Sequence, residues 1–514
     1  MEPQFPLAPV ADLPWLGYAS LLVIAVYFRF SRVLTIRNLD LILTLLIASA
    51  VVIASYFRDV PSFAQLDESP SAAVEAEVEP ASAETVLSNV PENAASETSS
   101  VERPMVRVHH PAYAWSSLAL VVLAVLLVVR LLFDESLTRR PRLDQNLNSA
   151  GLTFLCIPAF AILAFGVFLK PAPVTNVKAV ESGRALLQRR EVEVNPSTIQ
   201  SDIPAPTETL IAAGGAVVAQ LSGTLPNSVS VDTGETRDTE LLVARILVVV
   251  AHLVIILGLL YIGRQHFSSF QLGVAMSCLY LLLPCTAANV HKLSHVLPAA
   301  CLIWAFASYR KPAVAGILLG LACGTLFFAI FLLPLWAVFY GRHGAMRFGT
   351  SVLGVVVVLV TCLMMISGDA DSFFNRIVTS TNWTVYRLLD DTLSISQTPV
   401  SHLFIRIPMA AIFFVMLTAM TVLPRPRNLE NLLANSTALV VAAQMWYPDD
   451  IGTYVQWYMP LFLLVIFRPR LDRFMPPDMI ERQATSAPEN ISAGLPSTVA
   501  MSRLSLYRSN IVKP

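Results

Sequence analysis

The sequence predicts an all-α, polytopic membrane protein, and three observations support this fold class. Hydrophobic residues make up 55% of the 514 residues, whereas charged residues make up only 14%. The mean hydropathy of +0.62 is well above that of a soluble globular domain. Apolar runs such as 41–56, 118–133 and 349–366 approach the roughly 20 residues that cross a hydrocarbon core of about 30 Å.

The hydrophobic runs predict about 11 spans plus a broken intramembrane hairpin. The spans are placed at residues 15–30, 39–57, 112–133, 150–169, 241–262, 270–288, 294–308, 346–366, 403–423, 430–447 and 452–467. A further apolar element, 312–339, has basic residues at both ends and would measure about 42 Å as one helix. We expect two short helices folded back within the membrane, with a break near Gly324 and Thr325. A single tilted span is the alternative.

Basic residues gather in the short loops on one side of this topology. They are Arg29, Arg32, Arg37, Arg139, Arg140, Arg142, Arg264, Arg310, Lys311, Arg342, Arg347, Arg425, Arg427, Arg468, Arg470 and Arg473. Because Lys and Arg in short loops resist translocation, the pattern predicts an outside N-terminus and a cytoplasmic C-terminus. On the cytoplasmic side, Asp40 is expected to cap the second span or to pair with Arg37.

Two long polar segments interrupt the hydrophobic pattern. Residues 58–111 are rich in Ala, Ser, Glu and Pro, which predicts a disordered, acidic extracytoplasmic loop. Residues 170–240 fit either an extracytoplasmic loop or a small subdomain. The resulting organisation is a two-span hairpin (1–57), the acidic loop (58–111), a second two-span hairpin (112–169), the segment 170–240, a membrane core (241–473) and a disordered cytoplasmic tail (474–514).

Composition and motifs narrow the function classes. A net charge of −1 gives no indication of a nucleic-acid partner. The sequence contains no P-loop, no HExxH and no CxxC, which disfavours nucleotide-driven transport and zinc hydrolysis. All six cysteines lie in hydrophobic segments without the spacing of metal ligands. No cofactor or metal centre is expected, although a divalent cation on paired carboxylates stays open.

Three acidic residues are candidate catalytic groups on the outer face. Asp449 and Asp450 follow Pro448, which should end the preceding helix and leave both carboxylates in a turn between aromatic clusters. Neighbouring carboxylates can bind a hard cation or remove a proton from a substrate hydroxyl. A solvated turn in an aromatic belt is the alternative. Asp59, which follows the second span, is the third candidate, and an ordinary loop charge is its alternative.

Five cationic or imidazole side chains are candidate substrate-binding groups on the same face. They are His291, Lys292, His295, Arg376 and Arg387. Lysine meets a phosphate as a compact charge, and arginine can do so with two parallel hydrogen bonds. The alternatives are an interfacial turn with outward-pointing side chains for 289–295 and a solvated loop or surface helix for 368–391.

Residues 270–470 resemble the membrane core of the GT-C superfamily of integral-membrane glycosyltransferases. The similar segments are Leu281-Leu-Leu-Pro-Cys-Thr-Ala-Ala-Asn-Val290, Arg310-Lys-Pro-Ala-Val-Ala-Gly-Ile-Leu-Leu-Gly-Leu-Ala-Cys-Gly-Thr325, Phe331-Leu-Leu-Pro-Leu-Trp336, Tyr340-Gly-Arg342 and the outer loop 446–460. They are most similar to the branch that uses polyprenol-phosphate-mannose. The chain as a whole is similar to multi-spanning bacterial membrane proteins, which implies the bacterial inner membrane.

The resemblance implies a lipid-linked sugar transferase whose donor is a polyprenyl-phosphate sugar and whose site opens on the outer face. Two features depart from the family pattern. The family lysine after the Gly-rich helix falls near Thr325 or Leu326, and the family acid after the first span is matched here only by Asp59 after a second span. A transporter or flippase, or a non-catalytic membrane scaffold, therefore stays open. The sequence gives no oligomeric state.

Overall fold

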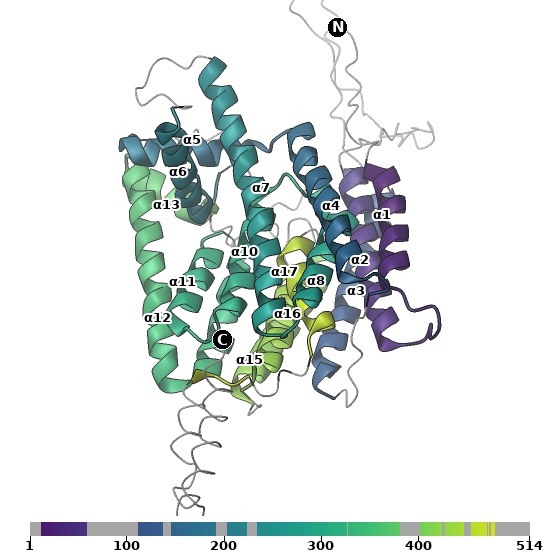
Figure 1. The fold of residues 1–514 in the computed structure, drawn as a ribbon. Coiled ribbons are helices and arrows are strands. Elements are labelled where there is room, and N and C mark those ends of the chain that lie inside the picture. Colours follow the sequence, from purple (N-terminus) through teal and green to yellow (C-terminus); the bar gives the residue numbers. More distant parts are fainter. Residues whose placement is uncertain are drawn as a thin grey trace, which may run out of the picture.

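The computed structural model of the protein is a bundle of helices that run in alternating directions (Figure 1). It describes residues 12–58, 111–136, 145–191, 203–223, 234–325, 327–380, 401–423, 427–446, 454–469, 471 and 474–477. Every regular element within these ranges is a helix, which confirms the helical fold class. Most of the predicted acidic loop and of the predicted C-terminal tail lies outside the described residues.

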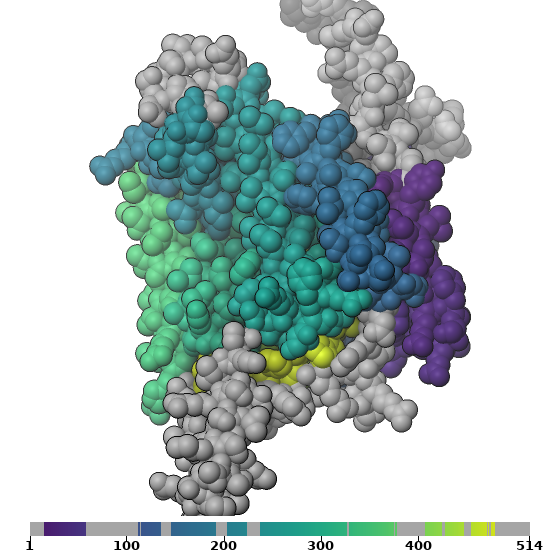
Figure 2. Space-filling view, in the orientation of Figure 1, coloured from purple at the N-terminus to yellow at the C-terminus, as the bar shows by residue number. Residues whose placement is uncertain are grey.

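Five helices of the described chain are long and apolar enough to cross a membrane. They are α2 (Ile36–Arg58), α3 (Pro111–Leu132), α4 (Ser149–Leu169), α7 (Gly234–Gln265) and α12 (Leu332–Ile366). Figure 2 shows α12, α7 and α4, in green, teal and blue, across one face of the bundle. Large apolar side chains such as Leu126, Phe154 and Leu353 are exposed, as contact with lipid requires. The chain is an integral membrane protein, and the count of about 11 spans stays a prediction.

Shorter helices complete the bundle. They are α1 (Asp12–Tyr27), α8 (Phe270–Leu282), α10 (Leu293–Ala307), α11 (Pro312–Cys323), α15 (Ser401–Val422), α16 (Leu429–Met445) and α17 (Val455–Phe467). The turns between α1 and α2, α7 and α8, and α10 and α11 lie at the lower end in Figure 1. We call this end, where the arginine-containing turns gather, the basic end. The opposite end is called the far end.

A network of five charged side chains, four of them buried and Arg130 half-buried, joins distant helices at the basic end. Arg130 on α3 donates from Nε and Nη2 to both carboxylate oxygens of Asp40 on α2, at 2.8 and 2.9 Å, and from Nη1 to Asp134 at 2.9 Å. Arg468, which follows α17, bonds the other oxygen of Asp134 and donates to the backbone carbonyl of Glu430 on α16 at 2.8 Å. The Glu430 carboxylate is 3.6 Å away from Arg468. Two guanidinium groups thus share three carboxylates.

The pairing of Asp40 was not the one that the sequence suggested. Asp40 bonds Arg130 on the next helix instead of the nearby Arg37, whose Nη2 donates to the Tyr27 carbonyl at 2.9 Å. The sequence interpretation relied on neighbours along the chain, whereas the partner is 90 residues away. Burial, and then the charge of Arg130, lower the pKa of Arg468 to about 9, so this guanidinium still carries its charge at neutral pH.

The apolar element 312–339 is broken close to the predicted position. Helix α11 ends at Cys323, and a short 3-10 helix, η3 (Phe327–Phe331), leads into α12. The backbone of α12 is interrupted at Gly341, where φ is 70° and ψ is −175°. Tyr340 Oη donates to the Tyr309 carbonyl at 2.8 Å, so the chain returns to the basic end before it runs up the rest of α12. Residues 312–339 therefore form two helical limbs, α11 and the first part of α12, that run in opposite directions.

Helix α6 (Pro206–Leu221) closes the break in this hairpin. The backbone N–H of Thr207 donates to the Gly324 carbonyl at 3.2 Å, and Thr207 Oγ1 donates to the Leu321 carbonyl at 2.8 Å. Both carbonyls lie at the C-terminal end of α11, where the Leu321 carbonyl also accepts from the Gly324 N–H at 3.2 Å and no following helical turn reaches Gly324. Because a buried carbonyl needs a hydrogen-bond partner, α6 contributes to closing the end of the broken helix.

The segment 170–240 contains two helices that pack together near the far end (Figure 1). They are α5 (Val174–Gln188) and α6, and they meet through small residues. A Cβ at Gly183 would lie 2.5 Å from the backbone nitrogen of Ala213, so the two backbones are in direct contact. The sequence left a loop or a small subdomain open for this segment, and its described part contains these two helices.

We expect Gly316→Ala to destabilise the protein by about 1–3 kcal/mol, because overpacking at a rigid contact costs that much. A Cβ at Gly316 on α11 would lie 2.5 Å from the Phe348 carbonyl oxygen on α12. The matched control is Gly349→Ala on α12, where no atom lies within 4 Å of the added Cβ. Thermal unfolding of the detergent-solubilised protein measures both. Equal unfolding midpoints for the two variants would contradict the close α11–α12 contact.

Arg130→Met should destabilise the protein by about 3–5 kcal/mol, because it leaves the buried Asp40 carboxylate without its ion-pair partner and removes one of the two arginines that bond Asp134. Arg347→Met is the control, since Arg347 is exposed on α12, and should change the stability by less than about 0.5 kcal/mol. Chemical unfolding in mixed micelles gives both values. A loss below about 1 kcal/mol for Arg130→Met would mean that the network is not a stabilising constraint.

Candidate functional site

The turn between α9 (Pro284–Ala288) and α10 is held by polar side chains from other elements. Lys170, which follows α4, donates from Nζ to the carbonyls of Ala287 and Ala288, both at 3.1 Å. A cation at this position satisfies carbonyls that end the short helix. Asn176 Nδ2 on α5 donates to the His291 carbonyl at 2.7 Å. The turn therefore joins α4, α5, α9 and α10.

The ends of α16 and α17 meet the same turn. Gln456 Nε2 on α17 donates to the Thr286 carbonyl at 3.3 Å. The Tyr454 ring stacks on the His295 imidazole, with ring centroids 4.7 Å apart and planes at 13°. Gln444 Nε2 on α16 donates to the Tyr454 carbonyl at 3.1 Å, so the two ends of segment 447–453 lie close together. We call the following residues the α9–α10 cluster: Lys170, Asn176, Thr286, Asn289, His291, Lys292, His295, Tyr454 and Gln456.

The α9–α10 cluster holds several buried polar atoms that no described residue satisfies. Thr286 Oγ1, Asn289 Nδ2, His291 Nδ1 and Gln456 Oε1 are buried without a hydrogen-bond partner in the described chain. The side chains of Thr286, Asn289 and Gln456 are almost fully buried. An unsatisfied buried polar group costs about 1–3 kcal/mol, so their concentration at one place calls for a functional explanation.

The α9–α10 cluster is electropositive. Burial, and then the charges of Lys170 and Lys292, lower the pKa of His291 to about 3, so this imidazole is neutral at physiological pH. Lys292 is the N-cap residue of α10, and no side chain caps the first turn of that helix. The positive end of the helix dipole adds to the two lysine charges. The arrangement suits an anionic ligand with neutral hydrogen-bonding groups beside the charge.

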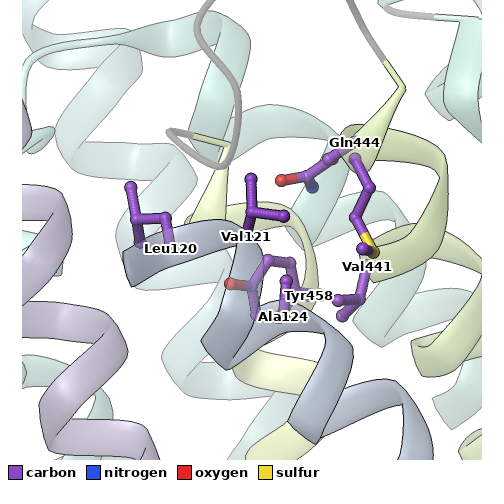
Figure 3. A pocket seen from close by; sticks show the side chains of 7 residues that line it. Leu120, Val121, Ala124, Val441, Gln444 and Tyr458 are labelled. Atoms are coloured by element: carbon purple, nitrogen blue, oxygen red, sulfur yellow. The ribbon is translucent and has the colours of Figure 1, made fainter. Parts of the chain in front are cut away.

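Gln444 also lines a small cavity on the other side of α17 (Figure 3). The cavity lies between α3, α16 and α17 and has about 270 Å³ of free space, part of which is open. Most of its lining is apolar, and Gln444 and Tyr458 supply its polar side chains. Gln444 Oε1 has no hydrogen-bond partner among the described residues. Polar atoms therefore flank the outer ends of α16 and α17 on two sides.

The predicted site residues have different outcomes. His291, Lys292 and His295 lie together in the α9–α10 cluster. Arg376 lies in α13 (Ala370–Ser380), which packs against α12, and burial lowers the pKa of its guanidinium. Four other residues lie outside the described chain, and their roles stay predictions: Asp59, Asp449, Asp450 and Arg387.

Sequence reasoning overlooked several members of the α9–α10 cluster. Lys170 directly follows an apolar run and Asn176 begins the next helix, and neither was considered. Gln444 and Gln456 were also overlooked. They lie at similar distances in the sequence before and after the acidic pair Asp449–Asp450. A search for isolated amides within apolar runs would have found both glutamines, because such groups need a buried partner.

A further buried carboxyl group, apart from the charged network at the basic end, lies at the start of α6. Helix α6 begins at Pro206, and Glu208 is its third residue. Glu208 Oε2 accepts from the Ala205 backbone N–H at 3.4 Å. Its Oε1 has no partner within the described ranges, and only 2% of the residue is exposed. Burial raises the pKa of Glu208 to about 7. Proline followed two residues later by glutamate is a recognisable helix start, so the sequence did contain this signal.

Together the bundle and the α9–α10 cluster define an integral membrane protein with an electropositive polar site at the far end. Comparison of the chain with protein-family models, with curated proteins and with solved structures found no match. The function is therefore argued from the site itself.

The free energy of unfolding should fall by up to about 3 kcal/mol as the pH rises from about 4.5 to about 7, because of Glu208. In this range the unfolded state releases the Glu208 proton, whereas the folded state, with its raised pKa, retains it. Glu208→Gln should remove this part of the pH dependence, and Glu181→Gln on the exposed side of α5 should keep it. Urea unfolding at a series of pH values measures the slope. The same slope in Glu208→Gln and wild type would contradict the assignment.

Proposed function

We propose that the protein is a GT-C-like glycosyltransferase that takes its sugar from a polyprenyl-phosphate carrier at the α9–α10 cluster. The observation that carries this proposal is the grouping of two lysines, a neutral imidazole and unsatisfied buried amides at one end of an apolar bundle. We further propose that the basic end faces the cytoplasm and that the cluster opens on the outer face of a bacterial inner membrane.

Each part of such a donor has a matching group in the cluster. The phosphate needs positive charge, which Lys170 and Lys292 supply as compact ammonium groups. The sugar hydroxyls need donors and acceptors, which Asn289, His291 and Gln456 supply through their unsatisfied atoms. The polyprenyl chain needs an apolar surface, and the exposed faces of the surrounding helices are apolar.

In the proposed reaction a carboxylate removes the proton from an acceptor hydroxyl. The hydroxyl oxygen then forms a bond to the anomeric carbon, and the bond from that carbon to the phosphate oxygen breaks. The electron pair stays on the departing polyprenyl phosphate, whose charge Lys170 and Lys292 stabilise. We propose Asp59, Asp449 or Asp450 as the base, with a divalent cation on the Asp449–Asp450 pair as an additional option.

Arg376 and Arg387 are proposed as alternative groups that bind the donor phosphate. They would act if the donor extended from the α9–α10 cluster toward α13, which carries Arg376. Arginine would then bind the phosphate with two parallel hydrogen bonds.

A transporter or flippase is the second candidate function, and the broken α11–η3 hairpin favours it. Discontinuous helices with a satisfied break often line substrate sites in transporters. Phe328, in η3, packs edge-on against Tyr454 at a centroid distance of 5.7 Å, so the broken hairpin adjoins the cluster. An anionic lipid could be recognised there without being consumed.

Asp449→Asn combined with Asp450→Asn should lower sugar transfer by more than tenfold, because general-base catalysis contributes about 10²–10⁴-fold. The assay uses the full chain in proteoliposomes with a labelled polyprenyl-phosphate sugar and a membrane-extract acceptor. Lys292→Gln should mainly raise KM for the donor. Lys311→Gln, at an exposed lysine of the basic end, is the matched control and should leave transfer unchanged.

Two results would decide against this proposal. A loss below tenfold in the double aspartate variant would exclude the acidic pair as the base. Movement of the labelled lipid between leaflets without release of polyprenyl phosphate would identify a flippase instead of a transferase.

A further inference from the structure

A second cleft, at the basic end, combines amide side chains with an apolar wall. It lies between the returning limb of α12, the end of α15 and the start of α16, and has about 370 Å³ of free space, part of it open. Leu335 and Met420 contribute to the apolar wall. Arg427, Asn428, Asn431 and Asn435 contribute the polar lining.

The polar lining is ordered along the helix axis. Asn428 caps the start of α16, where its Oδ1 accepts from the Asn431 N–H at 2.9 Å, and Asn431 and Asn435 are four residues apart on one face of the helix. At 1.5 Å per residue, this row of amides extends about 10 Å from the start of the helix toward the bundle interior. The headgroup and glycerol region of one bilayer leaflet is only about 5–8 Å thick, which is half the difference between the total and the hydrocarbon thickness of the bilayer. The row of amides is therefore long enough to cover it.

Arg427 is held at the open end of the cleft by the interruption of α12. A Cβ added at Gly341 would lie 3.1 Å from Arg427 Nη1, so the guanidinium packs directly over this glycine. Gly341 has a φ of 70°, a conformation that other residues rarely adopt. Arg427 is nevertheless exposed, and its charge is available at the mouth of the cleft.

We infer that this cleft binds an anionic glycerophospholipid. Arg427 pairs with the phosphate, for which its planar donor fork is suited. Asn428 and Asn431 donate to oxygens of the phosphate and glycerol, and Asn435 donates to an ester carbonyl further in. One acyl chain lies along Leu335 and Met420. A soluble phosphate would use only the charged end, whereas a lipid uses both the polar row and the apolar wall. This site lies at the opposite end of the bundle from the proposed transferase site and does not depend on it.

The test measures which lipid the full-length protein retains. Delipidated protein in mild detergent is mixed with equal amounts of phosphatidylglycerol and phosphatidylcholine, and native mass spectrometry reports the bound lipids. Wild type should retain phosphatidylglycerol at least about tenfold more than phosphatidylcholine, the preference expected of one well-paired charge. Arg427→Gln should remove this preference, and Arg427→Lys should restore part of it.

Two further variants test the row of amides and the position of the charge. Asn431→Leu should lower retention of both lipids even if Arg427→Gln folds poorly, because it interrupts the row of amides. Arg347→Gln, an exposed arginine outside the cleft, should retain phosphatidylglycerol as wild type does. Unchanged retention in Arg427→Gln and Asn431→Leu, or an equal loss in Arg347→Gln, would overturn the inference. Displacement of the lipid by millimolar glycerol 3-phosphate would show that the cleft binds a soluble phosphate instead.

Discussion

The buried pairing of Arg130 with Asp40 and Asp134 is the constraint on which the rest of the bundle depends. Through Arg468 it also fixes the start of α16 and the end of α17. Buried charges tolerate little displacement, because a separated pair would leave an uncompensated charge away from water. Helices α16 and α17 leave this anchor as rigid rods, and Gln444 lies 14 residues beyond Glu430, about 21 Å along α16. The network therefore sets where Gln444, Tyr454 and Gln456 meet the α9–α10 turn.

The two ends of the bundle differ in the kind of polar group that they bury: paired charged side chains at the basic end and mostly neutral groups at the far end. Within the network, only Arg468 Nε is buried without a partner in the described chain. At the basic end the charged groups form hydrogen bonds that also hold the backbone after α17, since Leu471 N–H donates to Glu430 Oε2 at 3.1 Å. At the far end, Thr286, Asn289, His291 and Gln456 retain unsatisfied atoms within the described chain.

Local signals explain what could be predicted from the sequence. Hydropathy along the chain predicted a helical membrane protein, and the Gly324–Thr325 pair marked the break after α11, because both depend on neighbouring residues. His291, Lys292 and His295 lie near one another because they are close in the sequence, although only His295 lies within α10. The contacts of Arg130 with Asp40, and of Lys170 with Ala287, join residues 90 and 117 positions apart, and no local pattern predicts them. Within segment 170–240, helix α6 coincides with an apolar stretch, whereas the mixed polar composition of α5 resembles that of a loop. The acidic candidates Asp59, Asp449 and Asp450 lie outside the described residues.

The contact between α6 and the broken hairpin has a consequence for how the protein is made. Thr207 precedes Leu321 and Gly324 by more than 100 positions in the chain, and synthesis runs from the N-terminus. Helix α6 is therefore translated before α11 leaves the ribosome. The group that completes the break is already present when the carbonyls that need it are formed. In the reverse order the Gly324 carbonyl would be made before the Thr207 N–H that pairs with it, so the order of the elements along the chain lets this group find its partner early.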